Sequence, residues 1–346
     1  MSETPNLLYR LQRRRNAITM LLVLWWYCSA VLCVTSSKVF LVATGMPMLL
    51  SCLQMVTSWL WCRSLLLVQG QPLVQLHGRT RVLVWKTASF YAMGFILTNV
   101  SISLMNASLA ETIKSAEPIS SVVLAALYTT EGWPSIHKLI SLVPIVLGVA
   151  LASFADATFV TLGLVAAVGS NFCFSARAMY AKKIAEQSNP AHCMDDLHLF
   201  CYVCSIGSII TAVFAVCMDG PRLYQLLLEL ELSKAGLDWW PVQVAVLNGT
   251  MYCWYNLASF MVLSRVQLVT HATLNVIRRC FIIVVATVVF AVQVTRMNVL
   301  GVALALTGFA AFLADGALCK RRAKLLNVVT PRALRVVCAT DVEKNV

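Results

Sequence analysis

Charged residues interrupt two of the most apolar stretches of this chain. One stretch carries Glu111, Lys114 and Glu117, and a later one carries Arg278 next to Arg279. A charge near the centre of a bilayer costs about 2.5–3.5 kcal/mol on insertion scales, so such residues usually face the interior of a helix bundle and mark a functional site. These five residues are therefore the first candidates for chemistry.

Their balance of charge points to an anion. With Arg177, which lies in a third apolar stretch, the four cations exceed the two glutamates by two charges. Guanidinium forks match the oxygens of a phosphate, and a lysine ammonium adds a point charge. We therefore expect Lys114, Arg278 and Arg279 to bind a small phosphorylated anion.

Two plainer interpretations stay open. Lys114 could pair with one or both of Glu111 and Glu117, because residues three apart share one helix face. Arg177 is followed closely by Lys182 and Lys183, and could reach lipid headgroups with them instead of facing a ligand. Neither interpretation accounts for Arg278 and Arg279, which have no acidic residue on their own stretch.

The elements that must position these residues are membrane-spanning helices. Hydrophobic residues make up 59% of the 346 and charged residues only 12%, and the mean hydropathy is +0.78. Soluble domains carry about 25% charged residues, so this chain could not cover its own surface in water. A spanning helix needs about 20 mostly apolar residues, and such windows predict about ten spans in an all-α polytopic fold. We place them at 17–37, 42–63, 82–104, 107–129, 137–155, 158–181, 197–218, 239–264, 267–293 and 297–316.

The placement of basic residues predicts the topology. Arginines cluster before the first span and basic residues follow the last, and the loops on that side hold further cations such as Arg79, Arg81 and Arg265. The longest opposite loop (219–238) is acidic. The positive-inside rule then puts both termini in the cytosol, with 1–16 as a cytosolic N-terminal segment and 319–346 as a cytosolic tail.

A short internal repeat suggests duplication. The string LGVALA occurs at 147–152 and again at 300–305, each time in the last predicted span of a five-span half. Because five is odd, the second copy would insert upside down, which is the inverted arrangement that many transporters share, with the substrate near the midplane. We expect the halves to be 17–155 and 156–318.

Other functional classes find little support. The net charge of +12 follows from the loop bias, and no basic module stands outside the predicted spans, so we expect no nucleic-acid partner. Cys201 and Cys204 have redox-like spacing but lie inside a span, where cysteine acts as a small hydrophobe. No paired-Asp or His-Asp arrangement appears in the spans. We therefore expect no metal, no cofactor and no enzymatic reaction.

Several motifs carry a family resemblance. TNVSIS at 98–103 and ETIKSAEP at 111–118 resemble the third and fourth spans of the triose-phosphate translocator family, within the drug/metabolite transporter superfamily. The segments at 141–153, 177–183 and 264–266 are similar to it as well, so that the resemblance extends from about residue 20 to 318. It implies ten helices in two inverted halves, alternating access, and exchange of inorganic phosphate for phosphorylated compounds of three to six carbons.

The resemblance also assigns site residues. A threonine and a lysine that hold phosphate in plastid members match Thr98 and Lys114, and a Lys-Arg pair of the ninth span matches Arg278-Arg279. Two residues near the organic part of the substrate match Tyr255 and Arg177.

Two departures concern substrate and location. Phe95 and Glu111 stand where plastid members carry histidine, which puts the identity of the organic moiety in question. The form of the fourth span and the short amino terminus favour a Golgi or endoplasmic reticulum membrane over a plastid-type outer membrane. The alternative function is exchange of nucleotide sugars for nucleotide monophosphates, and a homodimer is left open.

Overall fold

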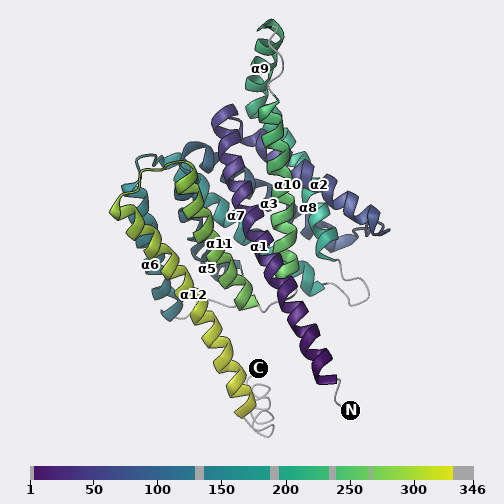
Figure 1. Cartoon of the computed structure of the whole chain (residues 1–346), viewed down its shortest axis with the longest axis vertical. Helices are drawn as coiled ribbons and strands as arrows, with labels where there is room; N and C mark the ends of the chain where they lie inside the picture. Colours follow the sequence, from purple (N-terminus) through teal and green to yellow (C-terminus); the bar gives the residue numbers. More distant parts are fainter. Residues whose placement is uncertain are drawn as a thin grey trace, which may run out of the picture.

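The computed structural model describes residues 4–128, 136–187, 195–233, 239–263, 265 and 268–329, and all regular structure within them is helical (Figure 1). The elements are α1 (Thr4–Thr44), α2 (Pro47–Val68), α3 (Gly78–Leu104), α4 (Ala107–Lys114), α5 (Glu117–Tyr128), α6 (Ile136–Ala155), α7 (Thr161–Gln187), α8 (Asp196–Phe214), η2 (Ala215–Asp219), α9 (Gly220–Ser233), α10 (Trp240–Leu263), α11 (Leu268–Val289) and α12 (Arg296–Val329).

The fourth predicted span departs from a continuous helix. The sequence predicts one helix over 107–129, whereas the structure divides it into α4 and α5. Pro118 explains the break, because proline has no N–H to donate to the carbonyl of Lys114 one turn earlier. Ser115 also turns its hydroxyl back to the carbonyl oxygen of Thr112 at 2.6 Å. Lys114 and Glu117 therefore lie on opposite sides of a helix break.

The prediction of an acidic loop at 219–238 is also partly wrong. The structure forms α9 over its first part. This segment is rich in leucine and glutamate, which are good helix formers. A π-helical turn (η2) joins it to the end of α8, and Asp219 in that turn accepts a hydrogen bond from the backbone N–H of Leu49 at 2.7 Å.

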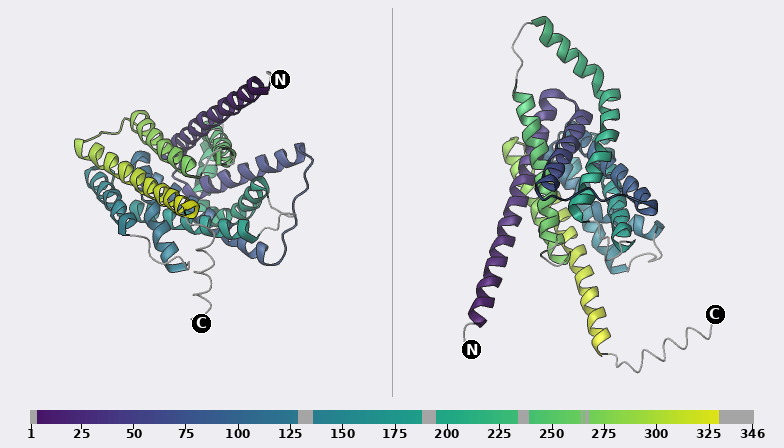
Figure 2. Two further views of the ribbon diagram at one scale, coloured as in Figure 1. Left: turned by 90° about the horizontal axis from the view of Figure 1, so that it is seen from below. Right: turned by 90° about the vertical axis from the view of Figure 1, so that its right-hand side faces the viewer.

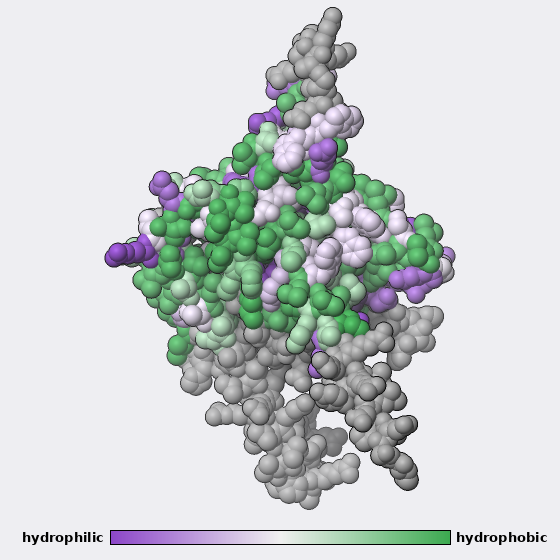
Figure 3. All heavy atoms as spheres, viewed as in Figure 1, coloured by the Kyte–Doolittle hydropathy of each residue, from purple (hydrophilic) through white to green (hydrophobic). Residues whose placement is uncertain are grey.

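The outer surface is that of a membrane protein. Large apolar side chains are strongly exposed along the helices, among them Phe154 (90%) and Val288 (74%). In Figure 3 hydrophobic residues (green) cover much of the coloured part of the face. Within the described residues, four helical segments are long and apolar enough to cross a bilayer, and two shorter helical segments are apolar as well. Hydrocarbon requires that backbone groups be satisfied inside the segment, as they are in helices.

The helices pair as an inverted duplication requires. Helix α1 packs along α10 as α7 packs along α3, and α2 contacts α10 as α8 contacts α3. The pairs α2–α8, α4–α11 and α6–α12 each join one element to its own counterpart in the other half. Figure 2 shows α6 and α12 side by side at the edge of the bundle.

The repeated LGVALA strings meet each other at this edge. A Cβ added to Gly148 would lie 2.6 Å from the carbonyl oxygen of Gly301, and one added to Gly301 would lie 2.8 Å from that of Gly148. Each glycine also faces the backbone of the last alanine of the other string, Ala305 or Ala152. Glycine permits this close approach because it has no side chain.

The start of α1 and the end of α12 lie at the same end of the bundle (Figures 1 and 2). We call this the terminal end, and the opposite one, from which α9 projects, the far end. The division of the chain at residue 155 and the cytosolic assignment of 1–16 and 319–346 stay proposals.

Candidate functional site

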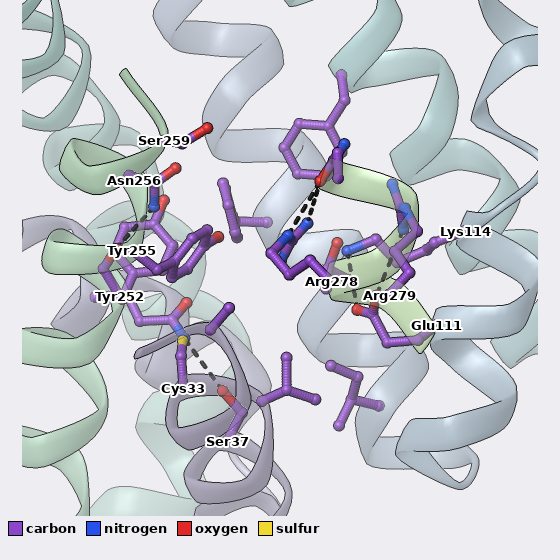
Figure 4. Close-up of a pocket in the computed structure, with 18 of the residues that line it drawn as sticks. Cys33, Ser37, Glu111, Lys114, Tyr252, Tyr255, Asn256, Ser259, Arg278 and Arg279 are labelled. Atoms are coloured by element: carbon purple, nitrogen blue, oxygen red, sulfur yellow. Dashed lines mark hydrogen bonds and ion pairs between the residues drawn. The ribbon is translucent and has the colours of Figure 1, made fainter. Parts of the chain in front are cut away.

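A cavity of about 210 Å³ lies between α1, α2, α3, α4, α5, α7, α10 and α11. All six residues that the sequence predicts as substrate-binding line it, although they come from five helices: Thr98, Lys114, Arg177, Tyr255, Arg278 and Arg279. Figure 4 shows Arg279, Lys114 and Glu111 gathered on one side of the cavity and Tyr255 with Asn256 on the other.

Arg279 is held by carboxylates from the broken fourth span. One guanidinium nitrogen lies 3.4 Å from an oxygen of Glu111, and another lies 2.6 Å from an oxygen of Glu117. The arginine side chain is only 5% exposed, and its Nε has no hydrogen-bond partner among the residues that the structure describes. Arg279 therefore joins α11 to both α4 and α5, and keeps one donor unused.

Lys114 is less tightly paired. Its Nζ lies 3.5 Å from the second oxygen of Glu111, and it sits 5.5 Å from the centre of the Phe174 ring. Glu117, which the ladder interpretation would also assign to Lys114, bonds to Arg279 instead. The fourth span therefore pairs Lys114 with Glu111 on one face of α4, while Glu117 is paired with α11.

Arg278 contacts no carboxylate within the described residues. Its Nε and one terminal nitrogen donate to the side-chain oxygen of Asn275, at 3.0 and 2.9 Å. The guanidinium lies over the rings of Trp26 and Tyr255, 5.6 and 5.8 Å from their centres. Aromatic faces attract a cation without cancelling its charge, so Arg278 keeps its full positive charge for a ligand.

Arg177 also borders the cavity. Its guanidinium lies 4.7 Å from the centre of the buried Tyr91 ring. The alternative, in which Arg177 reaches headgroups with Lys182 and Lys183, does not describe this geometry, because its charged group packs inward.

Four cations and two carboxylates thus line one small space: Lys114, Arg177, Arg278 and Arg279 with Glu111 and Glu117. Two positive charges are left without a carboxylate on this lining. A charge of two matches a phosphate dianion, and low dielectric surroundings strengthen the attraction.

The uncharged polar residues differ in what they offer. The hydroxyl of Thr98 donates to the carbonyl oxygen of Gly94 at 2.8 Å, so it would have to rotate to donate to a phosphate. The amide nitrogen of Asn99 donates to Ser51 and Gln54, at 2.8 and 3.0 Å. Asn99 therefore ties α3 to α2 through hydrogen bonds between helices.

A comparison with known protein families shows which family the chain belongs to. The model of the Triose-phosphate Transporter family matches residues 17–313, which include every residue that lines the cavity. The chain belongs to the Triose-phosphate Transporter family.

Relatives in this family include translocators of plants. Phosphoenolpyruvate/phosphate translocator 2, chloroplastic, of Arabidopsis thaliana is 32% identical over 243 residues, which are 68% of this chain and 62% of the relative. Triose phosphate/phosphate translocator, chloroplastic, of Zea mays is 27% identical over 289 residues, which are 84% of this chain and 68% of the relative. The chain spans 62% and 56% of the first two phosphoenolpyruvate/phosphate translocators that it matches.

The lining of this Triose-phosphate Transporter family member repeats itself between the two halves. On α3 the cavity is lined by Phe95, Thr98, Asn99 and Ile102, and on α10, with the same spacing, by Tyr252, Tyr255, Asn256 and Ser259. The lining residues of α1 and α7 also have the same spacing. They are Ala30, Cys33 and Val34 on α1, and Phe174, Arg177 and Ala178 on α7. The equal spacing places each pair at the same register of its half, as an inverted repeat requires.

Sequence reasoning found Tyr255 but missed other aromatic residues of the lining. Trp26, Phe174 and Tyr252 border the cavity, and two of them lie over cationic groups. Nothing in the sequence separates these rings from the other aromatic residues of the spans, because aromatic side chains are common in membrane helices. The one available signal was the repeat, since Phe174 and Tyr252 share a register with other lining residues.

Proposed function

We propose that this member of the Triose-phosphate Transporter family exchanges inorganic phosphate for a small phosphorylated compound by alternating access. The proposal depends most on the cavity with two positive charges in excess, where the contacts of Arg278 among the described residues are all with neutral groups. The names of the relatives, which are phosphate translocators, support the same function.

The size of the cavity supports a compound of three to six carbons. Pockets for drug-sized ligands measure about 300–1,000 Å³, and this one is about 210 Å³. A phosphate with a short organic moiety fits such a space better than a nucleotide sugar. The nucleotide-sugar alternative also finds no support in the names of the relatives.

The same charges explain why transport would be an exchange. In an empty cavity the uncompensated cations repel one another and oppose the closure that precedes reorientation. A bound phosphate removes this cost, so it lowers the free energy of the closed state relative to the open one. The empty carrier then returns slowly, and flux in one direction depends on a substrate from the other side.

Reconstitution tests the function. Purified protein in proteoliposomes is preloaded with phosphate, a triose phosphate, a hexose phosphate or a nucleotide monophosphate, and uptake of labelled inorganic phosphate is measured. Uptake stimulated by internal phosphate or sugar phosphate supports the proposal. Movement of nucleotide monophosphates and their sugars, without phosphate exchange, would overturn it.

Location and assembly need their own measurements. The relatives are chloroplastic translocators, so they lend no support to the Golgi or endoplasmic reticulum membrane that the sequence favours. We keep both termini in the cytosol as part of the proposal; tags at the two ends that are accessible together before the inner membranes are permeabilised would support it. A homodimer stays a proposal for a mass measurement in detergent.

A further inference from the structure

Lys38 is a cation that the anion site does not use. It lies on α1, away from the charged cluster and towards the far end. Its Nζ donates to the carbonyl oxygens of Ile102 and Met105, at 2.8 and 2.7 Å. These oxygens belong to the last turn of α3 and its cap, where carbonyls lack helical partners and the helix dipole is negative. Lys38 therefore binds the end of α3 to α1.

This contact belongs to a closed end of the bundle. An apolar cluster packs around it from α1, α2, α3, α4, α10 and α11, with Phe40, Leu41, Leu50, Ile102, Ala107, Ala110, Val244, Ala245 and Ala286 as its buried members. Next to it, the N–H of Asn106 donates to the hydroxyl of Thr158 at 3.1 Å. Helices of both halves thus close the bundle between the cavity and the far end.

The repeat gives Lys38 a counterpart. Lys38 follows the lining residue Val34 by four positions on α1, and Lys182 follows the matching residue Ala178 by four positions on α7. The acceptor Ile102 matches Ser259 in the lining of α10. Met105 and Val262 each follow three positions later. Lys182 and the carbonyls of Ser259 and Val262 therefore stand at the terminal end as Lys38 and its acceptors stand at the far end.

The two ends differ in packing. Helix α1 packs against α3, whereas α7 makes at most marginal contact with α10 within the described residues. Lys182 is exposed. Since the halves are related by an inverted repeat, this difference is the one expected when only one end of a carrier is closed.

We propose that Lys38 and Lys182 are paired latches of opposite conformations. Lys38 stabilises the conformation closed at the far end by capping α3. When the terminal end closes, Lys182 donates to the carbonyls of Ser259 and Val262 at the end of α10, and Lys38 releases α3. The inference rests on the proposed function, because it needs a carrier that alternates between two closed ends.

The test measures which end is open. Ala178 is exposed and lines the cavity, so Ala178→Cys provides a reporter. A water-soluble, membrane-impermeant thiol reagent is added to sealed vesicles that expose the terminal end, and labelling of that cysteine is followed by peptide mass spectrometry. Lys38→Met is expected to slow labelling by up to about tenfold, which is the lower end of the effect of hydrogen bonds from a charged donor. Lys182→Met is expected to accelerate labelling, towards the rate of a terminal end that is fully open.

Matched variants separate the latch from a loss of folding. The double variant is expected to return towards the unmodified rate, because both conformations lose one latch. Lys38→Arg keeps the donors and is expected to keep the rate. Lys183→Met is the control: Lys183 occupies the register of Val39, next to the latch, and lies against the Tyr180 ring.

Each outcome bears on one proposal only. Shifts of the same sign in Lys38→Met and Lys182→Met, no shift in either, or an equal shift in Lys183→Met would overturn the latch. Because labelling needs no substrate, opposite shifts in a protein that exchanges no phosphate would uphold the latch and reject the proposed substrate. Phosphate exchange without opposite shifts would uphold the proposed substrate and reject the latch.

Discussion

Arg278 and Arg279 are adjacent in the sequence but have different surroundings. Arg278 rests on Asn275 and two aromatic rings, while Arg279 is fixed by Glu111 and Glu117. Because residues next to each other on a helix point about 100° apart, one of the pair faces the ligand space and the other ties the fourth span to the ninth.

Replacing Arg278 therefore tests ligand binding. In Arg278→Gln the side chain keeps polar atoms but loses its charge and its fork. We expect phosphate counterflow in proteoliposomes to fall by about 30-fold or more, since hydrogen bonds to charged groups contribute about 1.5–3 kcal/mol each. The melting temperature in detergent should stay near that of the unmodified protein. If phosphate counterflow per amount of reconstituted protein is unchanged in Arg278→Gln, the role of Arg278 in binding is contradicted.

Replacing Arg279 tests stability instead. Arg279→Met takes from Glu117 the guanidinium that bonds to it at 2.6 Å and leaves Glu111 paired, among the described residues, with Lys114 alone. Removing one member of a buried ion pair costs about 3–5 kcal/mol. We expect a lower melting temperature in detergent and a lower yield of folded protein. The double variant Arg279→Met with Glu111→Gln should recover part of the loss. If Arg279→Met melts like the unmodified protein, the triangle of charges is not structural.

At this scale the sequence predicts which residues meet, but not how they pair. Buried charge is costly wherever it occurs, so the cations could be found by their mere presence in apolar stretches. Their pairing depends on contacts of α11 with α4 and α5, in which Arg279 meets glutamates more than 150 positions away in the sequence. It also depends on a break that turns Glu117 towards Arg279. Spacing within one span carries no such information.

At the scale of the elements, the crossing of α6 and α12 depends on two glycines. Gly148 and Gly301 each face the backbone of the other helix, which cannot move aside as a flexible side chain can. Gly301→Ala should therefore push the helices apart and cost about 1–3 kcal/mol, the range for overpacking. Thermal unfolding in detergent measures this. Gly220→Ala is the control, because the nearest atom to its added Cβ is 3.8 Å away, and equal melting of the two variants would contradict the prediction.

The elements themselves were largely predictable, because a lipid environment leaves helices as the available structure for long apolar stretches. The repeated LGVALA strings indicated the duplication. Their direct contact could not be predicted, since two identical strings can lie at opposite edges of a bundle. Pro118 could have indicated the break before it, but the apolar residues around it favoured the prediction of one continuous span. The helix α9 was not predicted, because the charged residues of its segment indicated a loop.

At the scale of the whole molecule, the structure combines a symmetric frame with an asymmetric closure. The pairings of helices and the lining of the cavity repeat between halves, while the contact of α1 with α3 has no equally packed counterpart between α7 and α10 among the described residues. The sequence could predict the symmetry from span number and charge. It could not predict which end is closed, because both conformations use the same residues.

The two uncompensated charges of the cavity have a consequence for transport across an electrically polarised membrane. Moving one elementary charge through a potential of 100 mV involves about 2.3 kcal/mol. A cavity that holds a phosphate dianion carries no net charge as it reorients, whereas an empty one carries two. We expect loaded exchange to be insensitive to a potassium-diffusion potential in proteoliposomes, and the slow return of the empty carrier to change with it. Exchange that follows the voltage would show that the loaded cavity is not neutral.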